Sequence, residues 1–333
     1  MQSEANIIKA NRPRRGGIKG LLLSPEVSIL IPLIVLSVIT GIINPKFLSW
    51  GNFSVILRYS TFIGVVAIGQ AVVIMSGEID LSVGANACFS GIIFGVCAIT
   101  YDLGFIPSAL IAMLAGGLIG FINGYLVASF GLVNFITTLA TMFLCHGLAI
   151  TISGGEPIAP LPDAYFDFAL LRPLNLSWLF FIMLGILIIT EIVMRFTTIG
   201  RKVKATGGNK EAALMGGINI KRVKWGAYIF SGVLAGICGI LYAVELSAAS
   251  PESGIGLEFR TITACAVGGI SLMGGEGSIL GVGIGFVLLM VLANCLQLLK
   301  VESNWQLVII GAILIGAVLF DLAKKRVQAK SEQ

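Results

Sequence analysis

The sequence predicts an all-α protein, a polytopic membrane helical bundle of about ten transmembrane helices. Hydrophobic residues make up 56% of the chain and charged residues only 12%, whereas soluble domains carry about 25% charged residues. Apolar runs near the roughly 20 residues that a helix needs to cross a bilayer recur along almost the whole chain. A soluble protein with buried helices would show a polar face on most of them, and these runs have almost none.

Ten apolar runs account for most of the chain. In order, the predicted spans are residues 27–43, 60–75, 83–99, 105–128, 133–152, 176–194, 225–244, 261–273, 279–299 and 307–322. The eighth run is short and ends among paired glycines, so a broken or re-entrant helix would fit it. No soluble catalytic domain fits in the remainder.

Basic residues set the predicted orientation. They gather before the first span, between the sixth and seventh spans and after the last, and ten spans place all three segments on the cytoplasmic side. Both termini are therefore predicted to be cytoplasmic, with the acidic segments 153–177 and 247–258 outside. No A-x-A-like site follows the first span, so it is interpreted as a retained helix. The predicted regions are a basic N-terminal segment (1–26), a transmembrane domain (27–323) with a cytoplasmic loop (196–224), and a basic tail (324–333).

Charge and cysteine content argue against several other classes. The net charge of +5 comes from short stretches beside apolar runs, without a basic patch interleaved with aromatics, so no nucleic acid partner is expected. All six cysteines lie inside apolar runs without Cys-x-x-Cys spacing. They are interpreted as packing residues, with no metal site or disulfide framework.

Glycines at close-packing spacing predict a compact bundle. In lipid, close backbone approach supplies much of the adhesion between helices. The glycines are Gly116, Gly117, Gly120 and Gly124 in the fourth run, Gly232, Gly236 and Gly239 in the seventh, and Gly281 and Gly285 in the ninth.

The densest polar site lies between the second and third spans. It reads Ser-Gly-Glu-Ile-Asp-Leu-Ser-Val-Gly over residues 76–84, and its candidate residues for a structural turn or gate are Glu78, Asp80, Ser82 and Gly84. Polar groups at membrane depth are costly, and Asp80 and Ser82 can cap the following helix. A catalytic carboxylate pair is the alternative, but no nucleophile or metal-ligand set accompanies it. The single histidine, His146, is interpreted as a packed residue.

The fifth span carries polar residues on one helical face. Asn134, Thr137, Thr138 and Thr141 follow the i, i+3, i+4, i+7 spacing. Four polar residues on one face favour a water-lined pathway slightly over helix–helix hydrogen bonding. Gln70 and Asn86 are weaker pathway candidates, and Asn123 and Asn294 are interpreted as interhelical bonds.

The cytoplasmic loop predicts a short docking helix. Asn209 can cap a helix that begins near Lys210 and carries Glu211 in its first turn. Gly216 and Gly217 can end it. Ala212 and Ala213 lie within this short helix, and the charged residues flank it instead of covering it. This favours a docking helix over a connecting loop that its charges hold against acidic lipid.

At these residues the chain resembles the permease subunits of bacterial ABC importers, most closely the ribose-type sugar permeases. The Glu-Ala-Ala-x-x-x-Gly pattern at 211–217 is similar to the helix that couples such permeases to their ATPase. The turn at 76–84 resembles the family's Ser-Gly-Gly-Ile-Asp-Leu-Ser-Val-Gly signature, with Glu78 in place of the commoner glycine. The runs 135–141 and 264–275 are similar to two further family segments, and all four occur in family order.

The resemblance implies a division of labour. Two permease subunits, identical or closely related, would form the pathway in the bacterial inner membrane, and a periplasmic or lipid-anchored binding protein would deliver a sugar or sugar-like solute. A separate cytoplasmic ATPase would use ATP and Mg. This chain would bind no cofactor and would not be an enzyme; it has no Gly-x-x-x-x-Gly-Lys-Ser/Thr phosphate loop. Transport would proceed by alternating access between two arrangements of the bundle.

Two other classes stay open from the residues alone. An ion-coupled secondary transporter usually carries charges within its spans, yet Arg58, Glu191 and Glu245 lie near span ends. An intramembrane enzyme would use Glu78 and Asp80, but without a recognisable nucleophile.

Overall fold

The computed structural model describes residues 25–331, with side chains outside 25–33, 166–169, 303 and 320–331. Within this range every named element is helical, and one isolated antiparallel bridge pairs Ile158 with Ala249. The predicted all-α class is confirmed for these residues. The basic N-terminal segment predicted over 1–26 lies outside the described residues, except for its last two.

Seven described helices are long and apolar enough to cross a membrane. They are α4 (Trp50–Met75), α5 (Val83–Gly95) with its π-helical continuation η2 (Val96–Thr100), α6 (Phe105–Phe130), α7 (Asn134–Ser153), α9 (Trp178–Phe196), α12 (Ile220–Leu246) and α14 (Ile279–Leu298). They correspond to the predicted spans two to seven and nine. The other elements are α3 (Pro25–Ile43), η1 (Pro45–Leu48), α8 (Asp163–Leu170), η3 (Pro173–Asn175), α10 (Thr198–Gly208), α11 (Lys210–Met215), α13 (Leu257–Val267) and α15 (Ser303–Ser331).

The predicted first, eighth and tenth spans differ from these seven. The first and last correspond to α3 and α15, whose described apolar stretches, Ile34–Ile43 and Asn304–Leu319, are shorter. The eighth is a broken helix. Its helical part, α13, ends at Val267, and the chain continues without helix to α14. Gly269 and Gly274 in this stretch have φ of 81° and 90°, which a side chain would strain.

Helix α12 lies at the centre of the bundle. Its largest interface is with α6, and it also packs against α5 and α4. A Cβ atom on Gly120 of α6 would lie 2.2 Å from the carbonyl oxygen of Tyr228 on α12, and one on Gly239 would lie 2.1 Å from that of Ala87 on α5. The predicted close packing through glycines is therefore confirmed at these helices.

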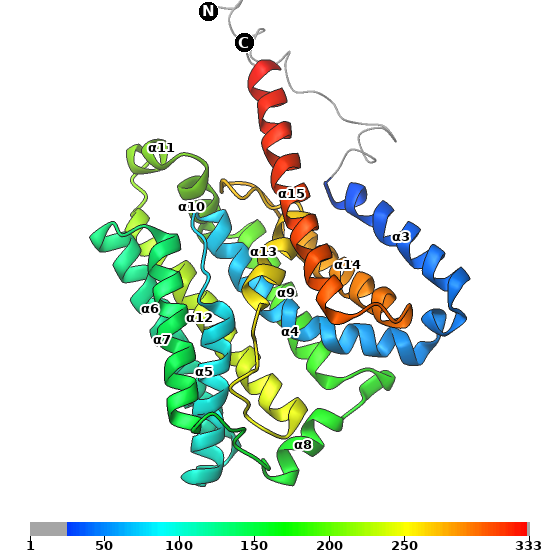
Figure 1. Cartoon of the computed structure of the whole chain (residues 1–333). Helices are drawn as coiled ribbons and strands as arrows, with labels where there is room; N and C mark the ends of the chain where they lie inside the picture. Colours follow the sequence, from blue (N-terminus) through cyan, green and yellow to red (C-terminus); the bar gives the residue numbers. More distant parts are fainter. Residues whose placement is uncertain (1–24, 332–333) are drawn as a thin grey trace, which may run out of the picture.

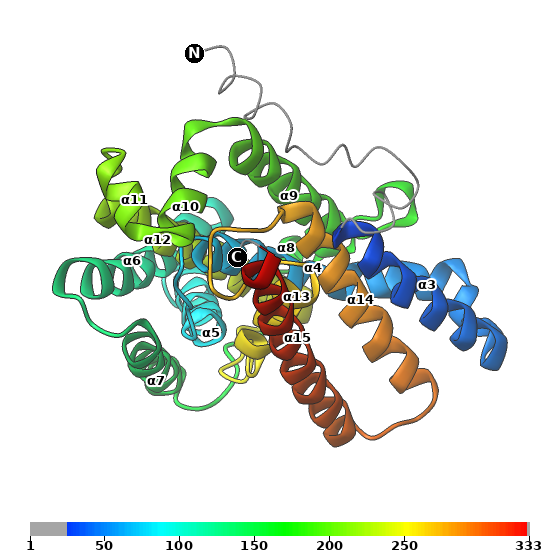
Figure 2. The same cartoon turned by 90° about the horizontal axis from the view of Figure 1, so that it is seen from above.

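The two ends of the bundle carry different segments. Helices α10 and α11 lie at the same end as the last turns of α15 (Figure 1). At the opposite end, the Ile158 N–H donates to the Ala249 carbonyl over 2.9 Å, and the Leu161 N–H donates to that of Ser247 over 3.0 Å. The two acidic segments predicted to share one side of the membrane thus pair with each other. From above, α6 and α7 lie opposite α3 and α14, with α4 and α12 between (Figure 2).

We expect Gly120→Val to destabilise the folded protein by about 1–3 kcal/mol, because the new side chain would force α6 away from the α12 backbone. Thermal unfolding of the detergent-purified protein would measure this change. Gly147→Val on α7 is the control, because a Cβ there meets no atom within 4 Å. Equal melting temperatures for the two variants would contradict the role of Gly120 in close packing.

Candidate functional site

The polar turn predicted at 76–84 is a non-helical segment buried between α4 and α5. Helix α4 ends at Met75, the Ser76 hydroxyl donates to the Val73 carbonyl over 2.7 Å, and Gly77 turns the chain with a φ of 85°. Residues 78–82 then run without helix to the start of α5. The side chains of Glu78, Asp80 and Ser82 are buried here.

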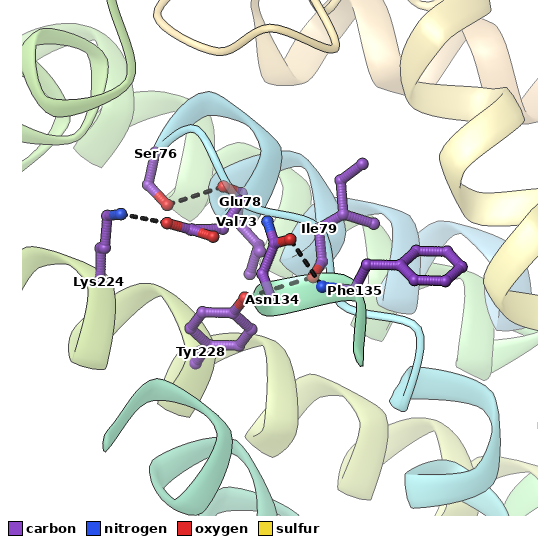
Figure 3. Close-up of polar contacts among 8 residues, drawn as sticks. All are labelled: Val73, Ser76, Glu78, Ile79, Asn134, Phe135, Lys224 and Tyr228. Atoms are coloured by element: carbon purple, nitrogen blue, oxygen red, sulfur yellow. Dashed lines mark hydrogen bonds and ion pairs between the residues drawn. The ribbon is translucent and has the colours of Figure 1, made fainter. Parts of the chain in front are cut away.

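Helix α12 holds this turn through two residues that lie one helical turn apart. The Lys224 ammonium forms an ion pair with the Glu78 carboxylate, which is only 7% exposed, and the Tyr228 hydroxyl donates to the Ile79 carbonyl over 3.3 Å (Figure 3). A buried carboxylate needs such a partner, because its desolvation is otherwise uncompensated. Glu78 is therefore an anchor for the turn.

Asp80 stabilises the turn from within. One of its carboxylate oxygens accepts hydrogen bonds from the Ser82 backbone N–H over 2.9 Å and from the Ser82 hydroxyl over 2.6 Å. With the Gln70 amide oriented so that both of its groups are paired, it donates to the Asp80 carbonyl over 3.0 Å and accepts from the Asp80 N–H over 3.3 Å. The predicted helix cap is wrong in detail. Ser82 occupies the N-cap position of α5 but makes no side-chain capping bond, because its hydroxyl is turned toward Asp80.

A chain of side-chain hydrogen bonds continues from this turn to α6 and then to α7. The Asn123 amide of α6 donates to the Ser82 hydroxyl over 2.9 Å, and its carbonyl oxygen accepts from the Thr141 hydroxyl of α7 over 2.7 Å. Asn123 is fully buried. Its predicted interhelical role is confirmed, and the turn is tied to α7 through it.

The polar face predicted on α7 lies against neighbouring helices. Thr137, Thr138 and Thr141 are buried. The Thr137 and Thr138 hydroxyls each donate to a backbone carbonyl one turn earlier, and the single hydroxyl hydrogen of Thr141 is shared between the Asn123 side-chain oxygen and the Thr137 carbonyl. Asn134 accepts from the Phe135 N–H within its own turn. None of these four residues lines a described cleft, so their pathway role stays a prediction.

A small cleft lies beside the other face of α7. It has a volume of about 160 Å³, and its lining includes His146, Gly84 and Glu258. A Cβ on Gly84 would lie 2.5 Å from a Glu258 carboxylate oxygen and 2.5 Å from the Gly254 carbonyl oxygen. Gly84 therefore permits the segment before α13 to approach α5. Sequence reasoning missed this pairing, because Glu258 is distant in the chain and in an apparently external segment.

The short helix predicted from Lys210 is present as α11, and its docking role stays a prediction. The Asn209 side chain caps it by accepting from the Ala212 N–H over 2.9 Å, Glu211 lies in its first turn, and Gly216 ends it. Gly217 follows with a φ of 75°. Ala213 is buried, whereas large apolar side chains project outward at Leu214 and Met215, which are 55% and 91% exposed.

Three segments meet backbone to backbone just before α11, and we call this contact the glycine junction. It consists of Gly77 in the turn, Gly207 and Gly208 at the end of α10, and Gly274 and Gly275 after α13. The Gly275 N–H donates to the Met75 carbonyl over 3.0 Å. A Cβ on Gly207 would lie 2.1 Å from that same oxygen, and one on Gly275 would lie 2.5 Å from the Gly208 Cα. The end of α10 thus touches both the turn at 76–82 and the non-helical stretch 268–278.

Sequence reasoning did not find this junction. The available signal was a Gly-Gly pair at 207–208 and another at 274–275. A Gly-Gly pair indicates that the backbone can adopt unusual angles at that position. It does not indicate that the two pairs contact each other, because that contact depends on the tertiary arrangement.

Comparison with known proteins identifies the family. A family model described as the permease component of branched-chain amino acid transport systems matches residues 52–318. The chain belongs to this permease family. No solved structure matches it.

Curated relatives of the permease align over most of both chains. The L-arabinose ABC transporter permease protein of Azospirillum brasilense is 33% identical over 92% of this chain and 90% of its own. The ribose import permease protein of Escherichia coli K12 is 32% identical over 89% of this chain and 93% of its own. An autoinducer 2 import system permease protein of Yersinia pseudotuberculosis is 31% identical over 89% of this chain and 84% of its own. The predicted resemblance to ABC importer permeases is confirmed, and the secondary-transporter and enzyme alternatives are not favoured.

We expect Asp80→Asn to retain most transport, because an amide oxygen can still accept from the Ser82 N–H and hydroxyl. Asp80→Leu removes the acceptor and leaves buried donors unpaired, at about 1–3 kcal/mol each, so it should lower the amount of folded protein. Solute uptake normalised to inserted protein separates the two effects. Normal insertion of Asp80→Asn with abolished uptake would show that the charge itself is functional.

Proposed function

We propose that this permease subunit imports a sugar or sugar-like solute across the bacterial inner membrane. The observation that carries the proposal is near full-length similarity to permeases named for L-arabinose, ribose and autoinducer 2 import. A second permease subunit, identical or closely related, completes the pathway, and a periplasmic or lipid-anchored binding protein delivers the solute. A separate ATPase binds ATP and Mg. Uptake of labelled pentoses by cells that express the complete system tests the substrate class.

The proposed topology has ten crossings with both ends in the cytoplasm. Helix α13 and the non-helical stretch 268–278 together supply the eighth crossing. The contact of Gly275 with the end of α4, next to α10, supports this crossing. Helix α14 also begins in this region, where the Ile279 N–H donates to the Glu191 carboxylate over 3.0 Å. The paired acidic segments 153–177 and 247–258 then face the binding protein.

Helix α11 is the proposed contact with the ATPase. Leu214 and Met215 expose apolar surface on a short helix at the predicted cytoplasmic end, and an exposed apolar patch is typical of a protein interface. The opposite side of the helix, at Ala213, packs against the permease itself. These side chains give α11 one face for each partner.

Coupling is proposed to pass through the glycine junction. A displacement of α10 and α11 by the ATPase moves Gly207, which has no side chain to absorb the motion before it meets Met75 and Gly275. The turn at 77–82 and the stretch 268–278 therefore respond directly. Both are already free of helical hydrogen bonding, so they can rearrange between two states at lower cost than an intact helix.

We expect Met215→Asp to weaken capture of the cognate ATPase at least tenfold and to reduce uptake, because it places a charge in an apolar contact. The folded permease should be unaffected, since Met215 is 91% exposed. Co-purification measures capture, and Lys210→Asp, at the start of the same helix, controls for charge. Undiminished capture by Met215→Asp would contradict the assignment of α11.

We expect single cysteines at Asn134, Thr138 and Thr141, in a background without the native cysteines, to react with a water-soluble thiol reagent during transport. Labelling at the two buried threonine positions should rise when ATP and the loaded binding protein are supplied, because the pathway must open to reach them. Leu139, on another face of α7, is the control. Equal labelling at all four positions in every condition would show that water does not distinguish this face.

A further inference from the structure

A cleft of about 640 Å³ lies between α9, α10 and α12, apart from the polar turn and the α7 face. Its walls are mainly apolar. Ile189 and Ile199 on these walls are 64% and 60% exposed, and Val193, Val223 and Phe230 are partly buried. Exposed aliphatic surface on the helices of a membrane bundle faces lipid where no partner subunit covers it, so this hollow is suited to apolar chains.

Two cations line the same cleft. They are Lys202 of α10 and Arg222 of α12, and both are exposed. No carboxylate lines the cleft, and among the described residues neither cation forms an ion pair. The hollow therefore combines apolar walls with positive charge that no neighbouring acidic group neutralises.

We propose that this cleft binds one anionic phospholipid, with its acyl chains against the apolar walls and its phosphate at Lys202 and Arg222. The proposal rests on the proposed topology, which places these cations at the cytoplasmic leaflet. That leaflet is anionic and attracts Lys and Arg near its surface. A guanidinium also matches phosphate oxygens in a two-point contact, so Arg222 supplies geometry as well as charge.

The charge and shape of the cleft favour a lipid over other occupants. A free phosphate would satisfy the cations but leave the apolar walls uncovered. The ATPase is expected at Leu214 and Met215 on α11, neither of which lines this cleft. A phospholipid matches both parts of the site at once.

The position of the cleft connects lipid binding to coupling. Gly217 and Asn219, which join α11 to α12, also line it. Asn219 caps α12 by accepting from the Arg222 N–H over 3.1 Å. A phosphate at Arg222 would therefore hold the return segment of the docking helix at the membrane surface.

Native mass spectrometry of the detergent-purified permease, titrated with phosphatidylglycerol or phosphatidylcholine, tests the proposal. We expect one tightly held phosphatidylglycerol and much weaker binding of phosphatidylcholine. Lys202→Gln/Arg222→Gln should weaken phosphatidylglycerol binding about 30-fold, the effect of two charges near an anionic surface. Lys210→Gln/Lys221→Gln removes two charges at the same end of the bundle outside the cleft and should leave binding unchanged.

A second variant tests the apolar walls without changing charge. Gly226 lines the cleft, and a Cβ there meets no atom within 4 Å, so Gly226→Phe should fill the hollow and displace the lipid without disturbing the helix. Gly147→Phe on α7 is the control. Inorganic phosphate should not compete, which distinguishes a lipid headgroup from a free anion.

Three results would overturn the proposal. They are equal affinity for the two lipids, full binding by both cleft variants, and photocrosslinking in membranes from a benzoylphenylalanine at position 226 to another protein in place of lipid. The titration requires neither ATPase nor transported solute. A loss of the proposed import function would therefore appear in uptake assays while lipid binding persisted, and a reversed topology would appear in accessibility of α11 from the wrong side.

Discussion

Contact between peptide backbones at the glycine junction determines how this bundle can contain non-helical segments. The carbonyls at a helix end lack intrahelical donors, and in lipid no water replaces them. At the end of α4, the Gly275 N–H supplies a donor to the Met75 carbonyl. Gly207 allows the end of α10 to approach the same oxygen. The junction therefore pairs a carbonyl at the end of α4 with an N–H of the non-helical stretch after α13, at the end of the bundle that carries α10 and α11 (Figure 1).

Helix α12 extends this arrangement into the core. Its first turns carry Lys224 and Tyr228, which bind the polar turn. Its later glycines bring the backbones of α6 and of α5 into contact with the backbone of α12. The residues that hold the turn therefore belong to the helix that holds the bundle together. Because its first residue follows the docking segment almost directly, α12 links that segment to the packed core without a flexible spacer.

Local patterns were predictable from the sequence where the interacting groups are close in the chain. Asn209 and the N–H it accepts from are three residues apart, so residue type and spacing sufficed to predict the cap of α11. The length of the apolar runs likewise predicted ten spans, and seven of them correspond to described helices long enough to cross a membrane. The bonding of Asp80 was not predictable in detail, since the donors that its carboxylate accepts from depend on the backbone angles at Ser82. The chain from Ser82 through Asn123 to Thr141 joins residues 41 and 18 positions apart, and only the packing of three helices brings them together.

Glu78 replaces the glycine of the resembled signature and changes what can move. Breaking a buried ion pair leaves an uncompensated charge, at a cost of about 3–5 kcal/mol when both groups are well buried. Lys224 is 15% exposed and Glu78 8% at their side chains, so separation of the pair within the apolar bundle is strongly opposed. The turn and α12 therefore move as one body. The surfaces left to slide between two states are those without charged side-chain links to that body, namely the glycine contacts with α10 and with the stretch after α13. In the proposed coupling, the Glu78–Lys224 pair fixes one side of the junction, and the glycines on the other sides carry the motion.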